Sequence, residues 1–430
     1  MADLAGRFAD FALNGQPDEG ALQVMRLSLL DWAAVGIAGQ DEPVSVLLRE
    51  QAEAEGGAEE AAIFGSAARV PGRMAALVNG TVSHALDYDD THFAHIGHPS
   101  VAVVPAALAA AQIAGAGGMA FQQAALIGAE ASVRIGVWLG RDHYQAGFHQ
   151  TGTAGAFGAA VAAGRLLGLD EGQMRMALGL VSTRASGLKS QFGTMGKPMN
   201  AGIAAQNGLE AALLARRGFV SNPDAIDGPQ GFGPTHHGME DGAGLEGLGT
   251  AWLFPGVHHK FHACCHGLHA ALEAIGTLPD TPDPIEAITV HTHPRWLSVC
   301  NIEAPETGLE AKFSYRVALS MALCGQDTAR LDSFSAETCA NSEVEEMRRR
   351  IGVEADESLS EMQARVIVTL ADGNVRELYH DLDADPGLSV RRQKVQDKAA
   401  RLIGGDRAEA IRDVIDRAAA PEEFAALIAG

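Results

Sequence analysis

Apolar residues recur along most of this chain at the three- and four-residue spacing of an α-helix. Near the amino terminus, four of them fall on one helical face: Leu22, Met25, Leu29 and Trp32. Asp18 precedes them as a helix start signal. Five later segments are rich in alanine and broken by glycine or proline turns, at residues 101–113, 121–136, 151–167, 170–180 and 201–217. The first part of the chain therefore predicts a bundle of mostly buried helices.

The pattern changes after residue 255, where short strand-like runs appear. A proline-rich stretch, Pro279–Pro284, leads into residues 287–291, which predict a strand. Residues 365–370 and 375–379 flank an Asp-Gly-Asn turn and predict a β-hairpin. One helix is predicted before the proline-rich stretch, at residues 264–276. Two more are predicted between the strand and the hairpin, at residues 313–323 and 344–351.

These segments predict a mainly α-helical protein with a smaller α+β domain. Helical spacing returns from about Ser389, so both ends of the chain are expected to form one helical domain, residues 1–255 with 389–430. The α+β domain is expected to be inserted between them, at residues 256–388.

Small side chains dominate the predicted helices. The chain has 430 residues, of which 47% are hydrophobic, 50 are glycine and only 5% are aromatic. Gly152, Gly155 and Gly158 resemble a glycine-rich phosphate loop, but no predicted strand precedes them. Their spacing instead favours close packing between helices.

The net charge bears on the partners of this protein, and the cysteine content bears on its location. The chain has 54 acidic against 32 basic residues and a formal net charge of −22, which repels nucleic acid and anionic membranes. A small anionic substrate remains possible where a few lysines gather. The 5 cysteines form no CxxC pair, and the amino terminus shows no basic and apolar leader pattern. We therefore expect a cytoplasmic protein.

One segment concentrates titratable side chains: Asp87, Asp89, Asp90, His92, His95 and His98. Neighbouring aspartates and histidines form proton-transfer sites and metal sites. The histidines lack the i, i+4 pair of a zinc helix, and His98-Pro-Ser predicts a turn into the next helix. Proton transfer is therefore favoured over a metal site. A histidine-rich metallohydrolase and a loop of ordinary surface residues stay as alternatives.

A second group runs from His258 to His269 and includes Lys260, Cys264, Cys265 and His266. No second thiol pair completes a zinc knuckle, so the cysteines do not predict a metal. The group lies where the fold is predicted to change domain, a position suited to lining a cleft. Ordinary helix-surface histidines are the alternative.

Basic residues are scarce in the helical part, so their positions are informative. Lys189 and Lys197 flank a glycine-containing loop, and Lys197 is favoured because Pro198 and nearby glycines bring the backbone close to a ligand. Further candidates for a polar site are Tyr144, His149 and Lys312.

Five segments, in order, resemble the MmgE/PrpD family: Ala85–Thr91 with His98–Ser100, Tyr144–Gly158, Gly193–Pro198, Lys260–His266 and Lys312–Tyr315. That family contains 2-methylcitrate dehydratase, cis-aconitate decarboxylase and iminodisuccinate epimerase. The resemblance implies a helical domain with a smaller α+β domain. The chain departs from some relatives at Ala263, where they often carry proline, and by one additional residue between Thr91 and His98.

The resemblance also implies active-site positions at Asp87, Thr91, His98 and Lys197, with His266 or His269 from the second group. We expect Lys197, and secondarily Lys260, to hold substrate carboxylates. His98, oriented by Asp87, is expected to move a proton. Thr91 and Tyr144 are expected to donate hydrogen bonds. His149, Lys189 and Lys312 are further candidates for substrate binding.

The function that the resemblance implies is a lyase that needs no metal or organic cofactor. It would abstract a proton next to a carboxylate and eliminate water from a small hydroxy-polycarboxylate, as 2-methylcitrate dehydratase does. An epimerase of a dicarboxylate such as iminodisuccinate and a cis-aconitate-type decarboxylase are the alternatives. The many small apolar helices favour a homodimer.

Overall fold

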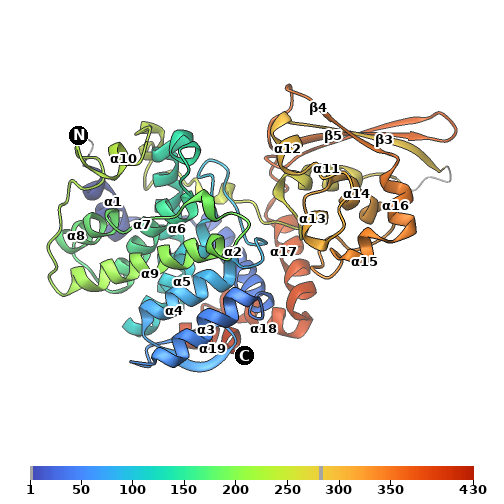
Figure 1. Cartoon of the computed structure of the whole chain (residues 1–430). Coiled ribbons are helices and arrows are strands. Elements are labelled where there is room, and N and C mark those ends of the chain that lie inside the picture. The colour runs from blue at the N-terminus through green and yellow to red at the C-terminus, as the bar shows by residue number, and fades with distance from the viewer. Residues whose placement is uncertain (1–2, 280–283) are drawn as a thin grey trace. The chain divides into compact units, whose positions relative to one another are not determined.

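The computed structural model describes residues 3–279 and 284–430, so most of the predicted Pro279–Pro284 stretch lies outside the described residues. The chain separates into two compact units, shown in Figure 1. The helical unit runs to His259 and resumes at Val395, and the α+β unit is Lys260–Lys394. The sequence placed these breaks at 255/256 and 388/389, and its division into domains stays a prediction.

The helical unit consists of helices joined by loops, with one small hairpin. Its helices are α1 (Leu4–Asn14), α2 (Glu19–Ala38), α3 (Pro43–Glu55), α4 (Gly72–His84), α5 (Pro99–Ala114), α6 (Gly118–Gln145), α7 (Gln150–Leu166), α8 (Glu171–Ser182), α9 (Gly196–Arg216), α10 (Phe232–Thr235), α18 (Gly405–Asp416) and α19 (Pro421–Ala429). Strands β1 (Ala61–Ile63) and β2 (Ser66–Val70) pair antiparallel. Helix α17 (Leu388–Ile403) starts in the α+β unit and ends here.

Helices α4, α5, α7 and α9 pack against one another, and α6 packs against α7 (Figure 1). Glycines allow their backbones to approach. A Cβ atom on Gly158 of α7 would lie 2.5 Å from the carbonyl oxygen of Gly128 in α6, and a Cβ on Gly155 would lie 2.6 Å from the Cβ of Ala102. The prediction of helix packing is confirmed for Gly155 and Gly158, whereas Gly152 approaches the loop backbone at Ser186.

Replacing Gly128 with alanine should therefore destabilise the protein. Its new Cβ would lie 2.6 Å from the Gly158 carbonyl oxygen, so the two helix backbones would have to separate. We expect a loss of about 1–3 kcal/mol in the free energy of unfolding, measured by denaturant titration. Gly172→Ala is the matched control, because Gly172 is exposed in α8 with its nearest contact at 3.4 Å. There alanine should be neutral or stabilise the helix by up to about 1 kcal/mol. Equal effects of the two variants would contradict this packing account.

Helix α2 is long and apolar enough by composition to cross a membrane, but 83% of its most apolar window is buried inside the protein. The side chain of Asp18 caps this helix by accepting from the backbone N–H of Ala21. The predicted start signal and buried face are confirmed. The cytoplasmic location and the homodimer stay predictions.

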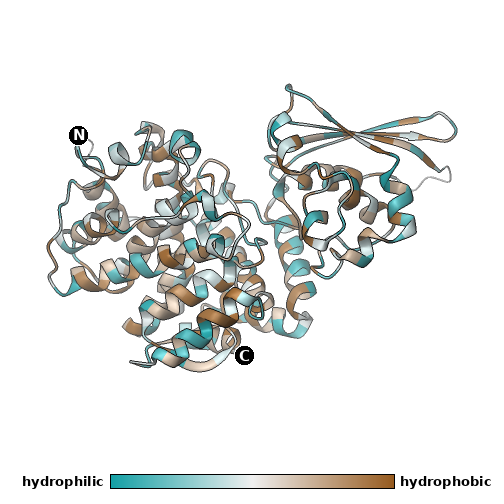
Figure 2. Ribbon diagram, viewed as in Figure 1, coloured by the Kyte–Doolittle hydropathy of each residue, from teal (hydrophilic) through white to brown (hydrophobic). Residues whose placement is uncertain are grey.

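The α+β unit contains a four-stranded sheet with the order β4-β3-β5-β6. Its strands are β3 (Ile285–Thr292), β4 (Ile351–Ala355), β5 (Gln363–Leu370) and β6 (Val375–Asp381). β3 pairs parallel with β4 and antiparallel with β5, and β5 pairs antiparallel with β6. The predicted strand and hairpin are confirmed. Buried and partly exposed residues alternate along β5, as expected for a sheet with one buried face. Figure 2 shows hydrophobic segments in brown on these strands.

Short helices complete this unit: α11 (His269–Ile275), α12 (Pro294–Val299), α13 (Gly308–Ala311), α14 (Tyr315–Leu323), α15 (Ala336–Cys339) and α16 (Ser342–Arg348). Two helices of this unit are shorter than the sequence predicted. The predicted 344–351 helix ends at Arg348, and Ile351 begins strand β4, which the sequence analysis missed. The predicted 264–276 helix is regular only from His269. Helices make up 57% of the structure and strands 10%, which confirms a mainly helical fold with a smaller α+β part.

Candidate active site

The loop between α4 and α5 carries the densest group of acidic and imidazole side chains in the helical unit. His84 is the last residue of α4, and His98 precedes Pro99 at the start of α5. Asp87 lies in the loop with a φ of 52°, in the left-handed region that aspartate tolerates better than most residues. This turn places the side chains of Asp87 and Asp89 near the two histidines.

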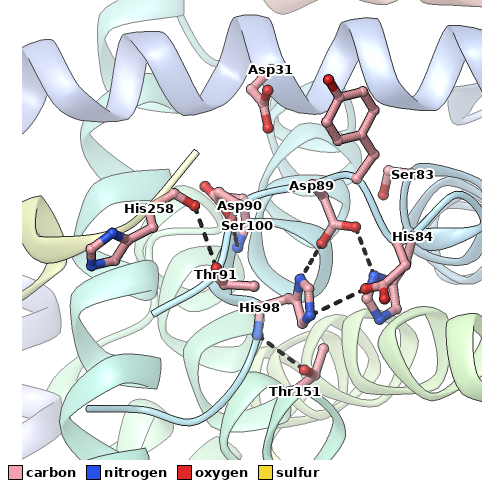
Figure 3. A network of polar contacts seen from close by, with 12 residues as sticks. Asp31, Ser83, His84, Asp89, Asp90, Thr91, His98, Ser100, Thr151 and His258 are labelled. Atoms are coloured by element: carbon pink, nitrogen blue, oxygen red, sulfur yellow. Dashed lines mark hydrogen bonds and ion pairs between the residues drawn. The ribbon is translucent and has the colours of Figure 1, made fainter. Parts of the chain in front are cut away.

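Asp89 lies between two imidazoles (Figure 3). Its carboxylate oxygens are 2.8 Å from Nδ1 of His84 and 2.7 Å from Nδ1 of His98. Burial opposes ionisation of Asp89, but attraction to His84 and His98 outweighs it and lowers the pKa of this carboxyl below its usual range. Asp89 is therefore a buried carboxylate that is hydrogen-bonded to His84 and lies in close ion-pair contact with His98.

His98 is held in a defined orientation. Burial lowers its pKa to about 4, although the neighbouring Asp89 opposes this shift, so the ring is neutral at pH 7. Because Nδ1 donates to Asp89, we assign the lone pair to Nε2, which lies 3.5 Å from Oδ1 of Asp87. The backbone N–H of His98 donates to Oγ1 of Thr151 at 3.0 Å. A neutral imidazole with one nitrogen fixed and the other unprotonated can act as a general base.

Lys197 brings a positive charge to this base. Its Nζ lies 2.7 Å from Oδ1 of Asp87, and its side chain is 18% exposed. Lys197 also stands in the first turn of α9, where the helix dipole favours an anion. His149 lies close by: its Nδ1 is 3.1 Å from Nδ2 of Asn200, and its ring centroid is 6.1 Å from that of His84. The predicted residues Asp87, His98, Lys197 and His149 are thus brought together.

The sequence analysis assigned the orientation of His98 to Asp87, but the structure places Asp89 in that position. Asp89 makes the 2.7 Å contact to Nδ1, whereas Asp87 faces the opposite nitrogen and pairs with Lys197. His84, which holds the other oxygen of Asp89, was also missed. The sequence marked Asp89 only as one member of the acidic run. The spacing of residues along a loop does not show which aspartate faces which nitrogen of His98.

The other predicted residues of the helical unit have identifiable contacts. Thr91 forms an antiparallel bridge with His258, and its Oγ1 lies 3.5 Å from the carbonyl oxygen of His258 (Figure 3). Lys189 contacts Tyr144: its Nζ donates to the backbone carbonyl at 3.0 Å and lies 3.8 Å from the ring centroid. This contact ties the ammonium of Lys189 to the Tyr144 loop.

The same group could in principle hold a divalent metal. Ligand atoms of His84, Asp87, Asp89 and His98 all lie within 4.8 Å of one another. Histidine and carboxylate ligands suit zinc and similar ions. However, the Lys197 ammonium at Asp87 would repel a cation, and Asp89 already binds two imidazoles. The arrangement fits proton transfer better than metal binding.

Asp90 gives a pH-dependent prediction. Burial raises its pKa to about 7, although the hydrogen bond from Ser100 opposes this rise and the charge of Asp31 supports it. Ser28 and Asp89 are its other polar neighbours. Between about pH 4 and pH 7 the folded state therefore holds more protons than the unfolded state, and this group's contribution to stability is lost as pH rises.

Asp90→Asn should remove this dependence. Thermal unfolding of both proteins at pH 5 and pH 8 measures it, and each kcal/mol corresponds to roughly 1–2 °C for a chain of this size. We expect the unfolding temperature of the variant, relative to that of the unmodified protein, to be higher at pH 8 than at pH 5. The same difference at both pH values would contradict a raised pKa.

The second predicted group lies in the α+β unit. The rings of His266 and His269 stack with centroids 4.9 Å apart, and burial lowers the pKa of His269 well below its usual value. His262 lies 3.6 Å from Glu273. The carbonyl oxygen of Lys312 accepts a hydrogen bond from the backbone N–H of Cys265, and Lys260 is buried. The stacked pair, in which burial keeps His269 neutral, can exchange a proton with an acid.

The cysteines of this unit do not have the character of nucleophiles. All 5, which lie within the described residues, are free thiols. Sγ of Cys300 lies 3.1 Å from Sγ of Cys265, and this contact together with burial raises the pKa of Cys300 far above its usual value. Burial likewise raises the pKa of the Cys264 thiol. Both thiols therefore stay protonated.

Comparison with known proteins agrees with these motifs. The MmgE/PrpD N-terminal domain matches residues 3–242, and the MmgE/PrpD C-terminal domain matches residues 262–419. The chain belongs to the MmgE/PrpD family. Membership supports a lyase-type function and names no substrate.

Three relatives of this MmgE/PrpD protein have names that contain cis-aconitate decarboxylase. A cis-aconitate decarboxylase-like protein oryM of Aspergillus oryzae is 32% identical over 63% of this chain and 60% of its own length. A cis-aconitate decarboxylase of Aspergillus terreus is 34% identical over 47% of this chain and 45% of its own. The cis-aconitate decarboxylase of Mus musculus is 25% identical over 93% of this chain and 86% of its own. The chain thus matches less than two thirds of the length of the fungal relatives.

Proposed function

We propose that this protein is a lyase that moves a proton at a carbon next to a carboxylate of a small di- or tricarboxylate. The observation that carries the proposal is the Asp89–His98 pair, which leaves the unprotonated Nε2 of His98 facing Asp87, the ion-pair partner of Lys197. A carbon next to a carboxylate is a weak acid, so its deprotonation needs a positioned base and a cation to stabilise the developing charge. His98 and Lys197 supply these two groups.

In the dehydration that we favour, Nε2 of His98 takes the proton from the carbon. Asp89 stabilises the imidazolium that forms, and Lys197 leaves Asp87 to bind the substrate carboxylate. The imidazolium then returns the proton to the hydroxyl on the adjacent carbon. Water leaves with the electron pair of the C–O bond, and a carbon–carbon double bond remains.

Decarboxylation is the second candidate, favoured by the names of the relatives. Here the C–CO₂ bond breaks, its electron pair stays on carbon, and the His98 imidazolium protonates that carbon. The two reactions need opposite forms of His98. Dehydration is lost as pH falls through the pKa of the base, whereas decarboxylation is lost as pH rises through it. Epimerisation of a dicarboxylate shares the first step and would return the proton from the opposite face.

Proton NMR of reaction mixtures tests the proposal. The protein is incubated with citrate, 2-methylcitrate, malate, cis-aconitate and iminodisuccinate, each after treatment with a chelator. A new alkene signal identifies dehydration, release of carbon dioxide identifies decarboxylation, and inversion identifies epimerisation. No product from any acid, with activity restored by zinc on an ester or amide substrate, would instead establish the metallohydrolase.

A further inference from the structure

We infer that Asp31, Asp90 and Lys398 form a positioning network that sets the distance between Asp89 and His98 from behind the loop. This inference rests on the proposed function, because it concerns the geometry of its base. The network joins three segments of the helical unit: α2, the loop between α4 and α5, and the last part of α17. Figure 3 shows Asp31 on its helix above the loop that carries Asp89 and Asp90.

Lys398 holds the backbone that carries both site carboxylates. Its Nζ donates to the carbonyl oxygen of Tyr88 at 2.6 Å and lies 4.0 Å from the centre of the Tyr88 ring. Tyr88 stands between Asp87 and Asp89 in the chain. The ammonium is also 2.5 Å from Oδ1 of Asp31, and the two side chains are 2% and 1% exposed. A fixed Tyr88 carbonyl therefore fixes where the two flanking side chains begin.

Asp90 ties the other end of the loop to the helix that begins after His98. Its Oδ2 accepts from Oγ of Ser100 at 2.5 Å, and its Oδ1 accepts from the backbone N–H of Ser100 at 3.4 Å. Ser100 lies two residues after His98 in the first turn of α5. Lys398 thus anchors the carboxylate side of the Asp89–His98 contact, and Asp90 anchors the imidazole side.

Stability alone does not explain this network. A buried ion pair contributes little net stability, because desolvation offsets most of its attraction, and apolar side chains often serve as well. An apolar side chain at 398 could not bond the Tyr88 carbonyl. Groups that face the network are Ser28 and Asp31 from α2, Asp89 from the loop and Lys398 from α17. Ser28 in turn contacts Nε2 of His259 at 3.0 Å.

The test is a double variant of the full chain, Asp31→Asn with Lys398→Met, which removes both charges and keeps similar volumes. We expect it to fold, to lose about tenfold or more in kcat with little change in KM, and to shift the acid limb of the pH profile downward. That shift follows because contact with Asp89 raises the pKa of His98, and a looser contact raises it less. Ser100→Ala is a second variant, which removes no charge. We expect it to lower kcat and shift the acid limb in the same direction, by less than the double variant.

Arg165→Met is the matched control. Arg165 also donates to backbone carbonyls of a distant segment, those of Ala12 and Leu13 at 2.6 Å and 3.2 Å, outside the site. Its loss should lower the unfolding temperature and leave kcat and the pH profile unchanged. Unchanged kcat and pH profile in both Ser100→Ala and the double variant would overturn the inference, as would an Arg165→Met variant with the same kinetic defect.

A second readout needs no substrate. The Nδ1–H proton of His98, identified by its loss in His98→Asn, should resonate far downfield in ¹⁵N-histidine-labelled protein, because it faces the Asp89 carboxylate. The double variant and Ser100→Ala should weaken or lose this signal, and Arg165→Met should keep it. An unmodified protein that is inactive on every acid would refute the proposed function, while this signal would still decide the positioning role.

Discussion

His98→Asn should lower kcat on the order of 10²-fold or more, with a much smaller change in KM. Asparagine has no basic nitrogen at the position of Nε2, so the step that moves the proton loses its base while the cation at Lys197 remains. Steady-state kinetics on the acid that the NMR panel identifies measures the effect. His98 is 8% exposed, and its contacts are with Asp87 and Asp89 of the same loop and with Thr151, so its replacement should leave the fold intact.

His291→Asn is the control for loss of a histidine. His291 lies in strand β3 of the α+β unit, 3.8 Å from Glu354, and has no part in the proposed chemistry. It should retain normal kcat. Asp89→Asn should approach the defect of His98→Asn, because an amide cannot hold the imidazolium by charge. Near-normal turnover of His98→Asn would remove His98 from the mechanism.

Lys197→Met should raise KM and lower kcat/KM by about 10- to 100-fold, the equivalent of the roughly 1.5–3 kcal/mol that a hydrogen bond to a charged group contributes. The reason is that the Lys197 ammonium pairs with Asp87 beside the base, so it needs only to exchange Asp87 for a substrate carboxylate. Isothermal titration with the substrate or a non-reacting dicarboxylate checks the binding loss directly.

Lys189→Met provides the comparison for Lys197. Lys189 flanks the same loop, but its ammonium contacts the Tyr144 ring and carbonyl. We expect its removal to change kcat/KM several-fold less than removal of Lys197. Equal losses at the two positions would indicate a general electrostatic effect of the loop, and an unchanged Lys197 variant would exclude this lysine from carboxylate binding.

The sequence predicted the class of fold because period and composition are local signals. The helical spacing up to residue 255, the Asp-Gly-Asn turn and the alternation in β5 each identify an element without knowledge of its neighbours. Strand β4 was missed because its five residues follow α16 almost directly, and its burial depends on pairing with β3. Such pairing is set by tertiary contacts that a linear pattern does not contain.

The candidate site was predicted in part for the same reason. Asp87 and His98 lie in one short segment of high titratable density, and Lys197 is conspicuous in a region poor in lysine. The role of Asp89 depends on the left-handed turn at Asp87, which decides which carboxylate faces which ring nitrogen. Lys398 lies 310 residues from Tyr88 along the chain, within a charged helix where it resembles a solvated lysine. Only the folded structure reveals its contact.

The most direct test of the central claim is deuterium exchange at the carbon next to a carboxylate. Chelator-treated protein is incubated in D₂O with the di- and tricarboxylates, beside the His98→Asn variant, and exchange is followed by proton NMR. The account predicts exchange by the unmodified protein and a loss on the order of 10²-fold in the variant. Exchange at equal rates in both proteins, or exchange that requires added metal, would contradict His98 as the base of a proton-transfer site.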